Sequence, residues 1–241
     1  GIHLNSNNYD TLHISDSNIK NTSSNGIYAE GSYKGIHLDN VGIDTTGNFG
    51  IYSTGNYKEI TLLNSSINKT DNDGLYVNGD YATVHIDSSS ITNSNSHGVF
   101  SNGTFSPITV NESVISNNEE IGVYTGNPNS LIIVTSSKIE NNGSSGIYSS
   151  GNYSGVIARN SIIKNNEGHG VFTNYYPIIV DYCLVSNNGI YGENHYGVYA
   201  SNDNNNEGGQ INFSTIIDNI YFGYYLAQTS NSFIKNSIIS G

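Results

Sequence analysis

Five acidic and histidine side chains in the last third of the chain could form a catalytic site. They are Asp181, Glu193, His195, Asp203 and Glu207. Glycosidic bonds are hydrolysed by two carboxyl groups that face one cleft, about 5 to 9.5 Å apart. These residues lie in or beside insertions around 188–196 and 202–209, and insertions in a repeat protein form protruding loops. The sequence therefore places a candidate site in these loops, with plain loop elaboration as the alternative.

Two further patterns resemble parts of metal sites. His13, His37 and His85 fall in one column of the repeat, with Thr61 between the last two. His13 and His37 could be neighbouring imidazole ligands of zinc, but no third ligand of the right kind accompanies them. The turn 71–74 (Asp-Asn-Asp-Gly) resembles part of a calcium loop without its closing glutamate. The sequence thus predicts no metal site and no cofactor, with Ca²⁺ at this turn as the alternative.

Aromatic side chains recur along the chain and form two series. The longer series is predicted to point outward and comprises Tyr28, Tyr52, Tyr76, Phe100, Tyr124, Tyr148, Phe172, Tyr199 and Tyr225. It could bind sugar rings or another protein, or its stacked rings could simply stabilise one face of the fold. The shorter series is predicted to cover a corner of the fold and comprises Tyr33, Tyr57, Tyr81, Phe105 and Tyr153.

A repeat of about 24 residues positions all of these side chains. Its marker glycines, each 24 residues apart, are Gly26, Gly50, Gly74, Gly98, Gly122, Gly146 and Gly170. Each begins a glycine–apolar–aromatic triplet, and an alternating pair such as Ile60 and Leu62 follows ten residues later. Alternation of this kind predicts a strand with one buried face. A third strand and an asparagine-rich turn complete the unit.

Three short strands per unit predict an all-β, right-handed parallel β-helix of about ten coils. We expect one domain over 1–241, with irregular coils over 170–222, belonging to a longer or end-to-end assembled protein. Stacked asparagines such as Asn142 are expected to form amide ladders at the corners. Cys183 falls in a column of small inward serines, so we expect it to contribute packing and not a nucleophile.

Charge and composition argue against several classes of binding partner. The net charge of −12, with only 8 Lys plus Arg, disfavours nucleic acids and other polyanions. No apolar run approaches the ~20 residues that span a bilayer, so membrane insertion is not expected.

The repeat resembles that of the pectate-lyase-like superfamily, in particular its NosD-type and surface-protein members. The resemblance rests on the Gly-Ile-Tyr triplets and on the segment Asn-Ser-Ile-Ile-Lys-Asn-Asn at 160–166, and it covers the whole chain. It implies the β-helix fold, which enzymes, adhesins and tail spikes share.

The catalytic residue sets of two such enzyme families are incomplete here. Residues 168–170 (Gly-His-Gly) match one short polygalacturonase motif, but the family's other motifs are missing. A pectate lyase would need an arginine base beside acidic calcium ligands, and we expect nothing acidic in the column of Arg159, the only arginine. We therefore assign no catalytic residue.

The sequence favours a non-catalytic extracellular module that assembles with itself at a cell surface, as a filament or stalk. The alternative is a domain that binds or degrades polysaccharide, with neutral glycans as its partners. Uninterrupted repeats and the aromatic series are compatible with both.

Overall fold

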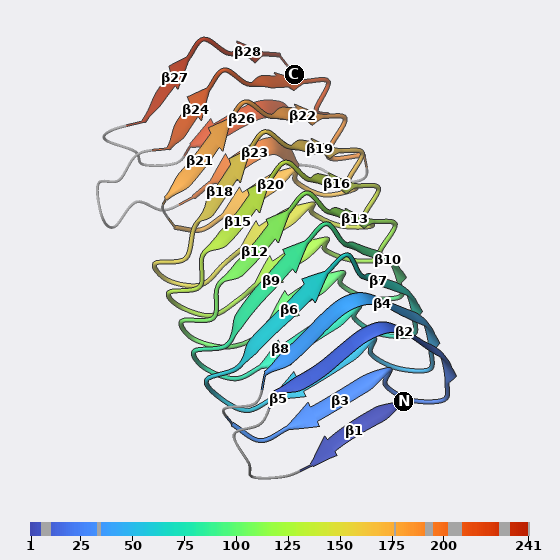
Figure 1. The fold of residues 1–241 in the computed structure, drawn as a ribbon. Coiled ribbons are helices and arrows are strands. Elements are labelled where there is room, and N and C mark those ends of the chain that lie inside the picture. Colours follow the sequence, from blue (N-terminus) through green and yellow to red (C-terminus); the bar gives the residue numbers. More distant parts are fainter. Residues whose placement is uncertain are drawn as a thin grey trace.

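The computed structural model describes residues 1–5, 11–32, 35–175, 177–190, 195–201, 209–226 and 232–240. Every regular element in this part of the chain is a β-strand. The strands wind into stacked coils that follow the chain order along one axis, from β1 at the N-terminal end to β28 at the C-terminal end (Figure 1). The predicted right-handed parallel β-helix is confirmed.

The first face of the rod is a ten-stranded parallel sheet, one strand per coil. Its strands are β1 (Ile2–Asn5), β3 (Ile27–Glu30), β5 (Ile51–Thr54), β8 (Leu75–Asn78), β11 (Val99–Ser101), β14 (Val123–Thr125), β17 (Ile147–Ser149), β20 (Val171–Thr173), β23 (Tyr196–Ala200) and β26 (Phe222–Leu226). Equivalent residues pair between successive coils, as Tyr28 does with Tyr52.

The second and third faces are joined through β2 (Leu12–Thr22) and β4 (Ile36–Thr46), which each run along both. The second face continues with β6 (Glu59–Leu63), β9 (Thr83–Asp87), β12 (Ile108–Asn111), β15 (Ile132–Thr135), β18 (Val156–Arg159), β21 (Ile178–Asp181), β24 (Gln210–Asn212) and β27 (Phe233–Lys235). The third face continues with β7 (Ser66–Thr70), β10 (Ser90–Ser94), β13 (Val114–Ser116), β16 (Lys138–Glu140), β19 (Ile162–Lys164), β22 (Leu184–Ser186), β25 (Thr215–Ile217) and β28 (Ile238–Ile239).

Apolar columns from the three faces meet inside the rod and form one core. Ile51, Ile60 and Ile67 represent the three faces in one coil, and each is fully buried. A single coil cannot bury these side chains, so the core exists only because the coils stack.

Corners in the left-handed backbone region separate the three faces. Asn117 and Asn141, for example, both have a φ of 57°. Asparagine tolerates this conformation better than most residues, which explains the asparagine-rich turns. The marker glycines have a different reason, because they do not take a left-handed φ; a Cβ at Gly98 would lie 2.6 Å from the Gly122 carbonyl oxygen of the next coil. Space, and not backbone conformation, requires glycine there.

Polar ladders satisfy the buried backbone at the corners. Asn118, Asn142, Asn166, Asn188 and Asn219 are buried, and each of the first four donates an amide hydrogen to the side-chain oxygen of the next at 2.9 or 3.0 Å. The same oxygens accept the backbone N–H of the preceding coil. The predicted amide ladder is therefore present, and it continues through the irregular coils.

Candidate functional site

The longer aromatic series, here called the aromatic stripe, runs outward along the first face. Tyr28, Tyr52, Tyr76, Phe100, Tyr124, Tyr148, Phe172 and Tyr199 are half-buried, and Tyr225 is 40% exposed. Neighbouring ring centroids lie 4.3 to 5.5 Å apart. The outward orientation matches the prediction.

The rings of the aromatic stripe largely cover one another's faces. The planes of Tyr148 and Phe172 differ by 4°, as do those of Phe172 and Tyr199. The stacking is broken between Tyr124 and Tyr148, whose planes differ by 72°, and a similar break of 70° separates Tyr76 from Phe100. Stacked rings stabilise the first face and offer mainly edges and hydroxyl groups to solvent. Binding by the stripe stays a prediction.

The column of positions one residue before each marker glycine lies beside the aromatic stripe, and in several coils it carries a polar side chain. Several of these side chains accept the backbone N–H of the equivalent residue in the next coil: Asn25 from Phe49, Asp73 from His97, His97 from Ile121, Ser145 from His169, and His169 from Tyr196. Any residue with a short-range acceptor can occupy this position. The two histidines accept through Nδ1 and therefore carry their proton on Nε2.

The first histidine of the column, His97, is enclosed by acidic neighbours. Its Nε2 lies 3.1 Å from Glu120 Oε2, and its ring contacts Phe100 and Tyr124. Burial lowers the pKa of His97, while the charges of Asp73 and Glu120 oppose that shift. Burial raises the pKa of the Asp73 carboxyl group. Every hydrogen-bonding atom of the His97 ring is thus used inside the fold.

The second histidine of the column, His169, opens into a pocket of about 330 Å³. Its ring stands 5.2 Å from the ring of His195, nearly perpendicular to it. Burial, followed by the charge of His195, lowers the pKa of His169 to about 4, so the ring is neutral at pH 7. His195 Nδ1 is buried without a hydrogen-bond partner in the described part of the chain. The pocket is lined by Gly143, Ser144, Ser145, Tyr148, Glu167, Gly168, His169 and His195.

A second hollow, of about 500 Å³, adjoins this pocket. It shares Gly143 and Glu167 with the pocket and adds Asn117, Asn118, Glu119 and Asn141. The two hollows together are called here the His169 groove; its lining comes from successive coils and includes Tyr148 of the aromatic stripe. Neutral imidazole, amide, hydroxyl and carboxylate groups line it, so it can both donate and accept hydrogen bonds.

Of the five candidate residues in the loops, the structure describes Asp181 and His195 and places them in different surroundings. His195 lies in the His169 groove, whereas Asp181 lies on the second face and forms an ion pair with Arg159 at 3.5 Å. Glu193, Asp203 and Glu207 lie outside the described residues. The expectation that nothing acidic accompanies Arg159 was wrong, because a coil of 22 residues brings Asp181 into register with it. The pair could not be predicted from a strict 24-residue spacing.

Two sequence patterns resembled parts of metal sites, and the structure shows the surroundings of both. His13 and His37 are in register with ring centroids 5.5 Å apart, but no cluster of three His, Cys, Asp or Glu suited to a metal occurs among the described residues. In the turn 71–74, Asp73 accepts the N–H of His97 at 2.9 Å. Among the described residues, no helix is long and apolar enough to cross a membrane.

Cys183 occupies the serine column, as expected. Its N–H is bonded to Ser214 Oγ at 3.1 Å, and its thiol donates to the Asp181 carbonyl oxygen at 3.3 Å. Burial raises the pKa of the thiol to about 11, so it stays protonated and unreactive at neutral pH.

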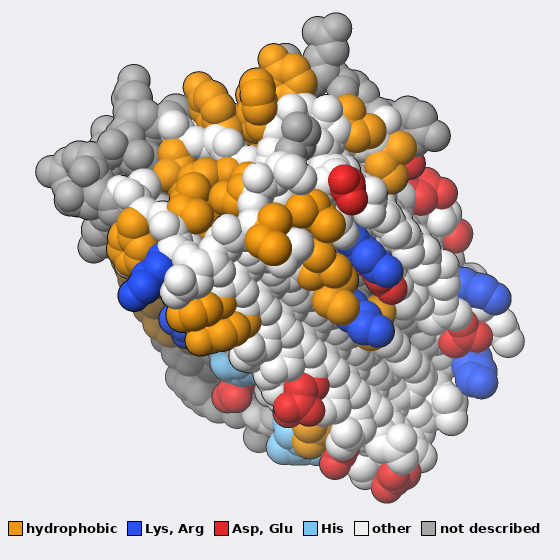
Figure 2. All heavy atoms as spheres, turned by 90° about the horizontal axis from the view of Figure 1, so that it is seen from above, with side chains coloured by type: hydrophobic (Ala, Val, Ile, Leu, Met, Phe, Trp, Pro, Cys, Tyr) orange, Lys and Arg blue, Asp and Glu red, His pale blue; other side chains and the backbone are white. Residues whose placement is uncertain are grey.

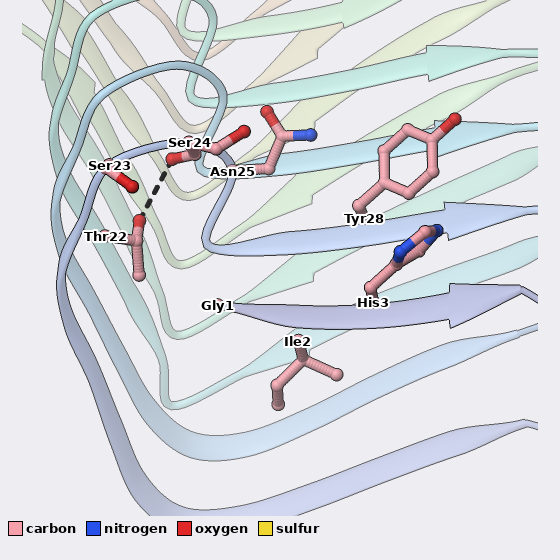
Figure 3. A pocket seen from close by; sticks show the side chains of 8 residues that line it. All are labelled: Gly1, Ile2, His3, Thr22, Ser23, Ser24, Asn25 and Tyr28. Atoms are coloured by element: carbon pink, nitrogen blue, oxygen red, sulfur yellow. Dashed lines mark hydrogen bonds between the residues drawn. The ribbon is translucent and has the colours of Figure 1, made fainter.

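The open side of the first coil carries another pocket, of about 420 Å³ (Figure 3). His3 and Tyr28 stand side by side on one wall, with ring centroids 4.6 Å apart. The turn 22–25 forms the opposite wall, held by a 3.0 Å hydrogen bond from Thr22 Oγ1 to the Ser24 carbonyl oxygen. Its lining contains no carboxylate, so it offers fewer acceptors than the His169 groove.

Comparison with known proteins identifies the family. Residues 1–124 and 49–192 match the right-handed β-helix region, so the chain belongs to that family. Among solved structures, the pectate lyase Pel9A is similar, with a TM-score of 0.59 and 18% identity over 94% of this chain and 60% of that chain. The A-module of the mannuronan C-5 epimerase AlgE4 from Azotobacter vinelandii has a TM-score of 0.47 and 12% identity, over 95% of this chain and 86% of its own. No curated protein sequence matches this chain significantly.

The family match and the likeness to the pectate lyase establish the fold. The chain spans less than two thirds of the pectate lyase that it matches.

Proposed function

We propose that this chain is a polysaccharide-binding β-helix domain that holds a neutral glycan in the His169 groove. The observation that carries the proposal is that two adjoining hollows share Gly143 and Glu167, and that their lining comes from successive coils. A groove lined by several coils suits an extended chain of repeating units better than a small molecule.

The lining of the His169 groove matches the hydroxyl groups of a sugar. Neutral His169 can donate from Nε2, while Glu167 can accept and Asn117 and Asn141 can do both. Tyr148 stands at a break in the aromatic stripe, so its ring is less fully covered than those in the stacked runs.

Charge favours a neutral glycan over an acidic one. Glu119 and Glu167 both line the groove, and the whole chain has a net charge of −12. A polyanion such as pectate would be repelled by these carboxylates. We therefore propose a different substrate class from that named for the structurally similar lyase.

A matched pair of variants tests this proposal. His169→Asn and His97→Asn should each retain the hydrogen bond to the next coil, since Asn25 makes it with a side-chain oxygen. A glycan array followed by calorimetry should show about tenfold weaker binding for His169→Asn, since one lost hydrogen bond is worth about 1.4 kcal/mol. His97→Asn should bind as the wild type does.

Absence of binding to every neutral glycan would refute the proposal, as would equal losses in both variants. We expect no release of reducing ends, because the polygalacturonase and pectate lyase residue sets are incomplete in the sequence.

The second candidate function is an extracellular module that assembles with itself. Phe222, Phe233, Ile234 and Ile238 lie on β26, β27 and β28 and are 47% to 64% exposed. Figure 2 shows apolar side chains on this end of the rod. A further coil, from the same polypeptide or from a second copy, could pair with these strands. Electron microscopy of the full-length protein would support this function by showing filaments, and a monodisperse monomer at all concentrations would refute it.

A further inference from the structure

The corner between the first and second faces carries an exposed row of rings, here called the corner ladder. Tyr57, Tyr81 and Phe105 are 49%, 47% and 45% exposed. Their ring centroids lie 4.9 and 5.1 Å apart and their planes are within 5° of parallel. The expectation that these rings cover the corner holds only in part, because about half of each remains in solvent. Tyr33 lies outside the described residues.

The three residues of the corner ladder, and Tyr153 further along the same corner, adopt a left-handed backbone, which is unfavourable for aromatic residues. The φ angles of Tyr57, Tyr81, Phe105 and Tyr153 lie between 54° and 57°. Such residues cost about 1–2 kcal/mol each. Stacking offsets that cost for the three consecutive rings. Tyr153 is 58% exposed, and among the described residues no aromatic ring contacts it.

One ring is missing between Phe105 and Tyr153. The backbone N–H of Phe105 bonds to the Pro128 carbonyl oxygen, and that of Asn129 bonds to the Asn152 carbonyl oxygen. This register places Asn129 in the next coil directly after Phe105, and Tyr153 one coil further. Asn129 has the same backbone conformation, with a φ of 56°. Its side chain ends at the amide, well short of where a ring would reach.

The gap has the thickness of a single sugar ring. Phe105 and Tyr153 stand two coils apart, and two coil spacings of about 5 Å, the spacing of the consecutive rings in the ladder, amount to about 10 Å. Two van der Waals contacts of about 3.5–4 Å leave roughly 2–3 Å between them, which a puckered six-membered ring fills.

We propose that Phe105, Asn129 and Tyr153 form a slot that holds one pyranose ring of a neutral glycan between two aromatic faces. The amides of Asn129 and exposed Asn152 lie at its floor and rim, where they can bond to hydroxyl groups. A purely apolar or aromatic guest would leave these amides without partners. The inference shares its ligand class with the proposed function and in that respect rests on it, but it concerns a different surface of the rod.

Filling the slot and removing a wall should both weaken this interaction. Asn129→Phe adds the missing ring, whereas Tyr153→Ala removes one wall; each should weaken binding at the slot about fivefold to tenfold. Asn129→Ala leaves the slot open but removes one amide, so it should bind about threefold more weakly than the wild type and still better than Asn129→Phe. Tyr57→Ala is the matched control, because it removes a ring of the same ladder outside the slot, and it should bind as the wild type does. The probes are neutral hexasaccharides of glucose, xylose, mannose and N-acetylglucosamine, added during aromatic NMR.

The NMR signals of Tyr153 and His169 report the two surfaces separately. Shifts at both support both proposals. Shifts at His169 alone overturn the slot and leave the proposed function standing, whereas shifts at Tyr153 alone support the slot and overturn the groove. If no probe shifts either residue, both proposals fail. If Asn129→Phe binds as well as Asn129→Ala, the slot is overturned whatever the shifts.

Discussion

His97 and His169 occupy the same position in the repeat but have opposite surroundings. Both precede a marker glycine, and both accept a backbone N–H from the next coil at 3.1 Å through Nδ1. Around His97, the next coil supplies Glu120, whose carboxylate lies 3.1 Å from the histidine Nε2. Around His169, the next coil supplies His195, and a pocket opens in front of the ring.

Glu120 and His195 are themselves equivalent, since each precedes the residue that bonds to the histidine Nδ1. The side chain at this position, Glu120 beside His97 and His195 beside His169, is one difference between the closed corner and the open polar groove. The repeat supplies the framework, and departures from the repeat supply the candidate site.

The largest predicted effect concerns the amide ladder that both corners share. Asn142→Ala removes the acceptor for the N–H and the side-chain amide of Asn118, and it should destabilise the fold by about 3 kcal/mol. Asn141→Ala, at the exposed position just before it, should cost only about 1–2 kcal/mol, because alanine tolerates the left-handed backbone there less well than asparagine. Urea unfolding measures both. Equal effects would show that the two corners do not depend on the ladder.

Acid should destabilise the protein through His169. Its pKa is about 4 in the folded state and near 6.5 when unfolded, so the unfolded chain binds the proton more readily. This contribution to stability is complete above pH 6.5, is lost as the pH falls from 6.5 to 4, and amounts to at most about 3 kcal/mol. The difference in unfolding free energy between wild type and His169→Asn, measured from pH 7 to 4, isolates it. A difference independent of pH would contradict the prediction.

Exchanging the partners of the two histidines should exchange their electrostatic surroundings. His195→Glu puts a carboxylate in place of the imidazole whose influence lowers the pKa of His169, so it should raise that pKa by about one pH unit. Glu120→His should lower the pKa of His97, because the carboxylate that opposes burial is removed. Histidine NMR titration measures both values. Unchanged pKa values would mean that the equivalent residues do not set the difference between the corners.

The smallest effect is expected at Cys183, in the irregular coils. Serine occupies the same column in neighbouring coils, where Ser161 and Ser214 bond to the backbone. Cys183→Ser should therefore change stability by less than about 1 kcal/mol, and the native thiol should react slowly with disulfide reagents at pH 7. Rapid labelling, or a large loss of stability, would show that these coils are built differently from the regular ones.

The sequence was informative wherever the 24-residue spacing held. Alternating apolar residues predicted the buried columns, and the paired asparagines predicted both the left-handed corners and the amide ladder. It failed at Arg159, because a coil of 22 residues shifted Asp181 into its register. Nothing in the spacing revealed that His195 would face His169.

The sequence by itself determined the fold, because a β-helix is specified by local periodicity repeated from coil to coil. The tertiary structure decided which side chains meet across coils of unequal length, and which ring faces remain open. The aromatic stripe shows the difference: its outward direction follows from alternation along a strand, but the mutual stacking that covers its faces depends on side-chain rotation. The His169 groove and the slot at Asn129 both arise where one coil differs from its neighbours, and such differences acquire meaning only when the coils are stacked.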